Sequence, residues 1–228
     1  IINEIGRQIT AARAVDDVLD RAAQLMCDRL GVHHVGIFVL DGARAELVLR
    51  SRAGEFAHLF AANHRLKIGQ GIVGWVAQHG QRLLANDVQA EPLYVNVYGE
   101  ALPTRSELAV PIMIAGVVHG VLDVQSPDLK AFEQNDVLAH ETLADQIAVA
   151  LENARLHEAA QREIIERTRA EEAWRESEAM LNATGQMAKV GGWELDAATQ
   201  AVKWTAETYR IHGLPVGQGP DLVEALQF

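Results

Sequence analysis

The chain has 228 residues, of which 49% are hydrophobic and 22% are charged, which is enough for one complete domain and part of a second. Its net charge of −11 argues against nucleic-acid binding, because phosphate contacts require clustered lysine and arginine. No apolar run reaches the roughly 18 to 20 residues of a membrane span, and the first residues given lack the basic start and apolar core of a secretory signal. We therefore expect a cytoplasmic protein in which this segment makes no membrane contact.

Cys27 is the only cysteine, which excludes disulfides within the chain and cysteine-rich zinc sites. On a helix its face would hold no group that activates a thiol, and neighbouring Asp28 disfavours the thiolate. We expect a structural cysteine. The adjacent His33 and His34 would point to opposite faces of a strand, so the sequence predicts no metal site and requires no cofactor.

Two helices are predicted at the N-terminus. Residues 16–30 place apolar side chains at helical spacing after Asp16, and Gly31 follows as a C-terminal cap. A shorter stripe upstream predicts a separate helix that packs outside the domain, through Ile2, Ile5, Ile9 and Ala12.

Short β-rich runs follow Gly31 and predict two antiparallel hairpins. The first pairs 35–40 with 47–52, and the second pairs 108–114 with 117–125 around Gly116. The intervening residues predict, in order, a helix over 55–63, a strand over 64–68, a helix over 72–78, a strand over 83–85 and a flap over 86–104.

One helical pattern runs from about Phe132 to about Met187 without proline, and the sequence beyond Glu158 is rich in Arg, Glu and Ala. A single solvated helix is marginal in water, so we expect this stretch to pair with a second copy as a parallel coiled coil. After Gly192 a new β-rich start predicts strands over 193–195 and 201–204 and a helix over 206–212.

The order of motifs in the first part of the chain resembles a GAF domain. The motifs are Val-Gly-Ile-Phe-Val-Leu-Asp at 35–41, Gly-Gln-Gly-Ile-Val-Gly-Trp-Val-Ala at 69–77, Glu-Leu-Ala-Val-Pro-Ile at 107–112 and Gly-Val-Leu-Asp-Val at 120–124. The resemblance implies an α+β fold, with a six-stranded antiparallel sheet, a ligand pocket on one face and the first and last helices on the other.

The later sequence resembles a different arrangement of signalling modules. Residues 166–178 are similar to the helical linker that precedes PAS domains, and Gly191-Gly-Trp-Glu-Leu-Asp196 resembles the start of a PAS domain. We therefore expect a GAF-like domain over 1–158, a coiled-coil linker over 159–187 and a truncated PAS-like segment over 188–228. The parent implied by this order is a bacterial signalling protein, most often a sensor histidine kinase.

Gly69-Gln-Gly71-Ile-Val-Gly74 also matches the dinucleotide-binding pattern GxGxxG. That pattern belongs after a strongly apolar parallel strand, whereas the surrounding strands here are short and form hairpins. The GAF resemblance implies instead that these glycines turn the chain sharply and bring the following helix over the pocket.

A small-molecule ligand pocket is predicted near the flap. Aromatic and apolar residues could line it together with a few polar groups, as is usual in such sites. His119, in an apolar strand, could be buried against Glu107 of the neighbouring strand. The predicted pocket residues are Ile72, Trp75, Tyr94, Tyr98, Glu107, Val110, Ile112 and His119.

Three functions remain open at this level. The first is a sensory region that binds a small ligand and relays its state through a homodimeric helix. The second is a dimerisation scaffold whose pocket is filled by side chains. The third is a small-molecule redox enzyme on the same fold, which the single cysteine and the absence of a catalytic residue set disfavour.

Overall fold

The computed structural model describes residues 2–10, 14–43, 45–61, 64–96, 102–199 and 201–217. The chain divides into two compact units, Ile1–Ala160 and Gln161–Phe228. None of the described helices combines the length and the apolar character that a bilayer span requires.

The first unit is built on a six-stranded antiparallel sheet with the strand order β3-β2-β1-β6-β5-β4. Both predicted hairpins are present, because β1 pairs with β2 and β5 pairs with β6. The strands are β1 (His34–Asp41), β2 (Glu46–Gly54), β3 (Arg65–Lys67), β4 (Leu83–Ala85), β5 (Ser106–Ile114) and β6 (Val117–Ser126).

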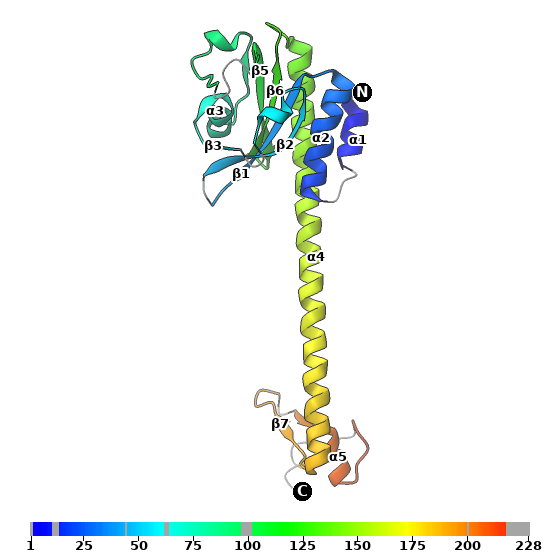
Figure 1. Cartoon of the computed structure of the whole chain (residues 1–228). Helices are drawn as coiled ribbons and strands as arrows, with labels where there is room; N and C mark the ends of the chain where they lie inside the picture. Colours follow the sequence, from blue (N-terminus) through cyan, green and yellow to red (C-terminus); the bar gives the residue numbers. More distant parts are fainter. Residues whose placement is uncertain are drawn as a thin grey trace. The chain divides into compact units, whose positions relative to one another are not determined.

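Helices cover both faces of this sheet (Figure 1). α1 (Ile2–Thr10), α2 (Val15–Leu30) and the first part of α4 (Gln134–Ala188) lie on one face, and α3 (Gly71–His79) lies on the other. The prediction that the first helix packs outside the domain is wrong. Ile5 and Ile9 of α1 belong to the main core, where they are 1% and 0% exposed.

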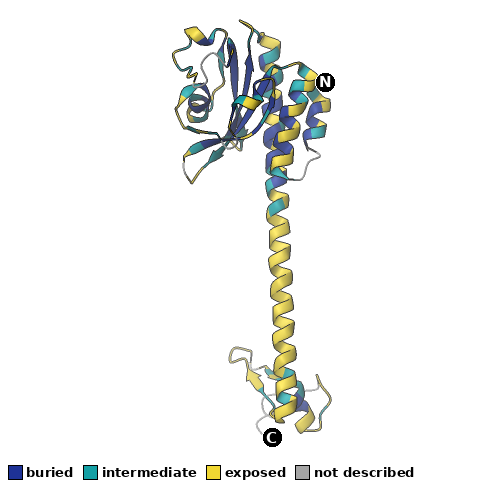
Figure 2. Cartoon of the chain, in the orientation of Figure 1, coloured by how far each residue is buried: buried dark blue, intermediate teal, exposed yellow. Residues whose placement is uncertain are grey.

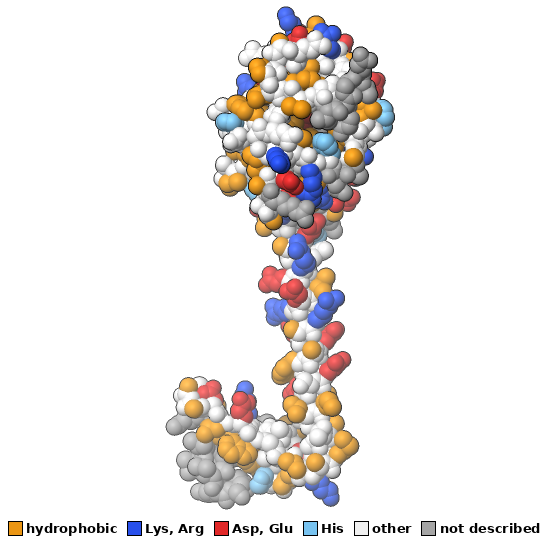
Figure 3. Space-filling view, turned by 60° about the vertical axis from the view of Figure 1, so that its left-hand side comes forward, with side chains coloured by type: hydrophobic (Ala, Val, Ile, Leu, Met, Phe, Trp, Pro, Cys, Tyr) orange, Lys and Arg blue, Asp and Glu red, His pale blue; other side chains and the backbone are white. Residues whose placement is uncertain are grey.

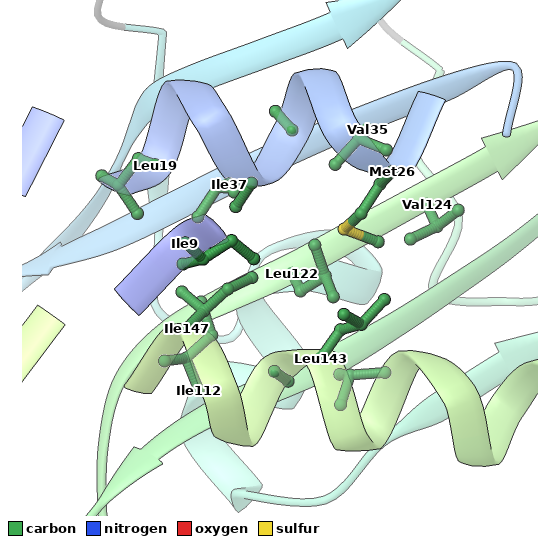
Figure 4. Packing of buried hydrophobic residues seen from close by; sticks show 14 of the residues in the cluster. Ile9, Leu19, Met26, Val35, Ile37, Ile112, Leu122, Val124, Leu143 and Ile147 are labelled. Atoms are coloured by element: carbon green, nitrogen blue, oxygen red, sulfur yellow. The ribbon is translucent and has the colours of Figure 1, made fainter. Parts of the chain in front are cut away.

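The main core lies between the sheet and the helices α1, α2 and α4 (Figure 4). Alternate residues of the central strands point into it, among them Ile37 from β1 and Leu122 from β6. Leu143 and Ile147 from α4 meet them and are fully buried. Each such side chain contributes about 1.5–3 kcal/mol through its burial, so α4 is held firmly against the sheet.

The predicted helix over 55–63 is reduced to the short 3₁₀ turn η1 (Ala57–Leu59), with residues 62–63 outside the described part of the chain. Two aromatic side chains explain the difference, because Phe56 and Phe60 are both buried in the second core cluster, beside α3. Side-chain burial therefore overrides the local helical pattern. A second 3₁₀ turn, η2 (Val88–Ala90), lies in the predicted flap.

α4 continues to Ala188, and its environment changes along its length. It is buried on one face as far as Ala154, whereas residues 159–181 are all exposed in the single chain (Figure 2). Charges of both signs alternate along this stretch (Figure 3), including an ion pair of 3.0 Å between Arg167 and Glu171.

The second unit adds a small hairpin and a helix to the end of α4. β7 (Trp193–Leu195) pairs antiparallel with β8 (Val202–Trp204), and α5 (Ala206–Ile211) follows. The predicted strands and helix are present, within one residue of the expected ends.

Candidate ligand cavity

A cavity of about 70 Å³ opens on the face of the sheet opposite the main core. Its wall comes from several elements far apart in the sequence, which the antiparallel order β1-β6-β5 brings together. The residues that matter most for its chemistry are Phe38 of β1, Ile72 of α3, Tyr94, Glu107 of β5, and Asp123 and Gln125 of β6.

Two carboxylic acids from neighbouring strands meet in this wall. Glu107 pairs with Gln125 across the β5–β6 ladder, and Ala109 pairs with Asp123, so the two acidic side chains lie diagonally on one face. The two carboxyl groups interact electrostatically and are only 4% and 2% exposed. Within the described residues, neither carboxyl forms an ion pair with lysine or arginine.

Burial without a cation makes ionisation of this pair costly. Burial raises the pKa of Asp123 to about 7, against a usual value of 3.8. Burial also raises the pKa of Glu107 well above its usual value, and the neighbouring charge of Asp123 raises it further. Near neutral pH the two carboxyl groups together therefore favour keeping a proton.

A chain of hydrogen bonds fixes one side of the pair. Thr104 donates its hydroxyl to Oε1 of Gln125 at 2.8 Å, and Nε2 of Gln125 donates to Oδ2 of Asp123 at 2.8 Å. Oδ1 of Asp123 and the hydroxyl of Tyr94 are buried without a hydrogen-bond partner in the described part of the chain. The cavity thus offers a free acceptor and a free hydroxyl, whose desolvation a bound ligand would offset.

The glycine-rich turn before α3 serves the fold rather than a phosphate. Gly71 adopts a left-handed φ of 68°, and a Cβ on Gly74 would lie 2.6 Å from the carbonyl oxygen of Lys67. The close approach brings α3 down onto the cavity, where Ile72 and Val73 line the wall. This arrangement agrees with the role that the GAF resemblance implies for these glycines.

The structure brings together only part of the predicted pocket. Ile72, Tyr94 and Glu107 line the cavity. Val110 and Ile112 do not, because they point into the main core on the opposite face, which corrects their prediction as pocket residues. Glu107 and Ala109 lie on the cavity side of β5. The residues between and after them, at alternate positions, face the main core and the helices α1, α2 and α4.

The remaining predicted residues lie elsewhere. Trp75 packs beside the cavity and stacks on His79 with ring centroids 4.3 Å apart, but it does not line the wall. His119 is half-buried and accepts a hydrogen bond of 2.8 Å from Arg155 of α4 instead of contacting Glu107. Tyr98 falls outside the described residues.

Sequence reasoning missed Asp123 and Gln125, although a signal was present. Asp123 is a charged residue inside the apolar run Gly-Val-Leu-Asp-Val, and in a strand its side chain must face away from Leu122 and Val124. Burying a single carboxyl group on the pocket side of a strand costs free energy unless the group has a partner or a function.

A GAF domain family model matches residues 12–152, which is more than half of the chain. The chain belongs to the GAF domain family. The chain is 30% identical over 119 residues to GAF domain-containing protein A from Dictyostelium discoideum, an alignment that covers 52% of this chain and 67% of that protein.

Solved GAF-fold structures agree with this assignment. The free methionine-R-sulfoxide reductase from Neisseria meningitidis, solved in complex with its substrate, superposes with a TM-score of 0.61 at 26% identity, covering 68% of this chain and 89% of that one. The GAF domain of an Acinetobacter phosphoenolpyruvate-protein phosphotransferase gives a TM-score of 0.60 at 24% identity, covering 68% and 92%.

Cys27 lies away from the cavity of this GAF domain. It belongs to α2 and packs against the main core, on the other side of the sheet from Glu107 and Asp123. Burial, followed by the charge of Asp28, raises the pKa of its thiol to about 11, so the thiol stays protonated at neutral pH.

Proposed function

We propose that this GAF domain is the sensory part of a signalling protein and binds a small ligand that presents a positively charged or donor-rich nitrogen group. The buried pair of Glu107 and Asp123, which faces the cavity without a cation, carries this proposal. An ammonium group beside the pair would replace the shared proton and compensate for the charge that burial makes costly.

The cavity also limits the size of the ligand. Its volume of about 70 Å³ is well below the roughly 300–1,000 Å³ of sites for drug-sized molecules. The hydrophobic part of the wall, from Phe38, Phe60 and Leu66, would hold a short apolar stem beside the charged group. A compact amine or amino acid suits this wall better than a nucleotide or a haem.

The signal would leave the domain through β6 and α4. Asp123 lies in β6, which precedes α4 in the chain, and α4 packs on the reverse side of the same sheet. In the proposed mechanism, occupancy of the cavity shifts β6, changes the packing of α4 in a parallel homodimer, and alters a downstream PAS-like region of a bacterial sensor histidine kinase or a related protein.

The experiment is a thermal melt of the whole chain and of its Glu107→Gln variant with amines and amino acids, including methylamine, ethanolamine and free methionine sulfoxide. We expect a concentration-dependent rise in melting temperature for at least one amine, and loss of that rise in the variant. Benzoate, an anion, is the matched control and should give no rise. If all the compounds leave both proteins unchanged and the chain is dimeric, the ligand-free scaffold is the better description.

A redox enzyme is the second alternative, because a free methionine-R-sulfoxide reductase is among the similar structures. Thiol-dependent reduction of a sulfoxide requires a thiolate at the site, which takes the sulfoxide oxygen and becomes a sulfenic acid as the thioether product leaves. A second thiol then condenses with the sulfenic acid to give a disulfide and water. This chain has one cysteine, which lies across the sheet from the cavity. Incubation with free methionine sulfoxide and dithiothreitol should therefore produce no methionine above the protein-free rate.

A further inference from the structure

A second cavity, of about 290 Å³, lies where β1 begins and β6 ends, and Gln125 borders both this cavity and the first one. It is bordered by the end of α2, the start of β1, the connection from β6 to α4 and the first turns of α4. Its wall combines apolar residues with two histidines and two acids. The residues that carry its chemistry are Val32, His33, Asp128, Phe132, Asp136 and His140.

His140 is the buried polar group of this cavity. Its side chain is 4% exposed, and its ring meets Phe132 edge-on with centroids 6.0 Å apart. Its Nδ1 lies 2.6 Å from the carbonyl oxygen of Asp136, and because a carbonyl oxygen only accepts, Nδ1 must be the donor. Burial lowers the pKa of His140, so the ring is neutral and Nε2 is a bare acceptor.

Nε2 of His140 has no hydrogen-bond partner in the described part of the chain. Buried acceptors in native proteins are almost always satisfied, so an unpaired one beside a cavity marks a place for a donor from outside the chain. The nearby carboxyl groups of Asp128 and Asp136 give the cavity a negative potential. Asp136 uses Oδ2 to accept the backbone N–H of Glu133 at 2.9 Å.

The other histidine is already engaged. Oγ of Ser126 accepts the N–H of Asp128 at 3.2 Å and lies 3.4 Å from Nδ1 of His33, so its single hydrogen is available for that nitrogen. The two histidines therefore do not form a metal centre together, and the described residues include no group of three or more metal-ligating side chains. The chemistry favours an organic cation over a metal ion.

We propose that this cavity is a second ligand site, which takes a small amine or amidine on an apolar body. The nitrogen group donates to Nε2 of His140 and lies near the carboxylate of Asp136, while the apolar body packs against Phe132 and Val32. Because the cavity is bordered by the β6–α4 connection, a bound ligand would hold the start of α4 in place.

The test uses the whole chain, labelled with ¹⁵N-histidine and titrated with benzylamine, with benzoate as the charge-reversed control. In the free protein we expect His140 to be neutral with the proton on Nδ1. Benzylamine should shift its Nε2 resonance saturably, with a millimolar dissociation constant, and benzoate should not. A proton on Nε2 in the free protein, or no saturable shift with benzylamine, would overturn the proposal.

Two variants make the result specific. His140→Phe should weaken benzylamine binding at least about tenfold, measured by calorimetry, because it removes a hydrogen bond to a charged group. Asp136→Asn keeps an oxygen for the N–H of Glu133 and should weaken binding about threefold to tenfold. Unchanged affinity in both variants would refute the site.

Glu107→Gln separates this site from the first cavity. The variant should bind benzylamine at His140 as tightly as the parent chain, whatever becomes of the ligand proposed for the first cavity. If Glu107→Gln abolishes the binding and His140→Phe does not, benzylamine occupies the first cavity and the second-site proposal is wrong.

Discussion

The carboxyl group of Glu107 on β5 interacts electrostatically with that of Asp123 on the neighbouring strand β6, and both residues are almost fully buried. The pair keeps a proton that each residue would lose in the unfolded chain at neutral pH. We therefore expect the carboxyl pair to respond both to pH and to a cation that can displace its proton.

The contribution of this carboxyl pair to the stability of the GAF domain should fall as pH rises through about 7. The pKa of Asp123 is about 7 in the folded protein and that of Glu107 is raised well above its usual value, so the stabilisation present at low pH is lost as pH rises through these values. His34 and His140, whose pKa burial lowers, are unchanged in a Glu107 variant, so comparing that variant with the parent isolates the carboxyl pair.

The measurement is urea unfolding of residues 1–160 at several pH values, for the parent sequence and for Glu107→Gln. The glutamine side chain does not ionise, so the variant lacks this titrating carboxyl group. We expect the variant to lose less stability than the parent as pH rises through about 7. Parallel pH profiles for the two proteins would show that the pair does not hold the proton.

His34 should limit stability on the acidic side. It is 1% exposed, stacks on Phe60 with centroids 4.8 Å apart, and burial lowers its pKa to about 4. The pKa of His34 is lower in the folded protein than its usual value of 6.5. The neutral ring therefore stabilises the fold above pH 6.5, and this contribution is lost as pH falls towards 4. Replacing it with an aromatic ring that has no proton to gain removes this loss.

We expect His34→Phe to be more stable than the parent at pH 4.5, by on the order of 2 kcal/mol, with a much smaller difference at pH 7.5. Urea unfolding followed by circular dichroism measures both values. His58→Phe is the control, because His58 is exposed and should leave the acid limb unchanged. Equal acid sensitivity of His34→Phe and the parent would refute the assignment to His34.

The sequence predicted the order of strands and helices because hydrophobic periodicity and turn residues are local signals. It did not predict which pocket residues would meet. Val110 and Ile112 are an odd number of residues from Glu107 and so face the main core instead of the cavity, and Asp123 lies within an otherwise apolar run. The contact between Glu107 and Asp123 depends on the β5–β6 register, which long-range pairing sets.

The packing of α4 against the sheet should depend on its buried residues. Ile147 is 0% exposed within the main core, whereas Val149, two residues further along, is 56% exposed. Ile147→Ala should lower the free energy of unfolding by about 2–5 kcal/mol, because it leaves a cavity. Val149→Ala should change it by less than about 0.5 kcal/mol in a dilute monomer.

Both values come from urea unfolding of the whole chain at low and high protein concentration. A cost for Val149→Ala that grows with concentration would place Val149 in a dimer interface. A small cost for Ile147→Ala at every concentration would contradict the packing of α4 against Leu122 and Ile112.

The exposed stretch of α4 should depend on a partner helix and on helical continuity. Ile164→Pro removes a backbone N–H and places a ring against the preceding turn, at a cost of about 3 kcal/mol or more to the helix. Because α4 packs on the sheet only as far as Ala154, the GAF domain should melt at the same temperature in the variant. Hydrogen exchange should show faster exchange at residues 165–185 and no change in β5 and β6, and sedimentation should show a weaker dimer.

Ile164→Ala, which keeps the N–H and a good helix former, is the control and should retain most of the protection. Protection of 165–185 that survives the proline would mean that this stretch is held by contacts other than a continuous paired helix, and the proposed relay from β6 through α4 would fail with it.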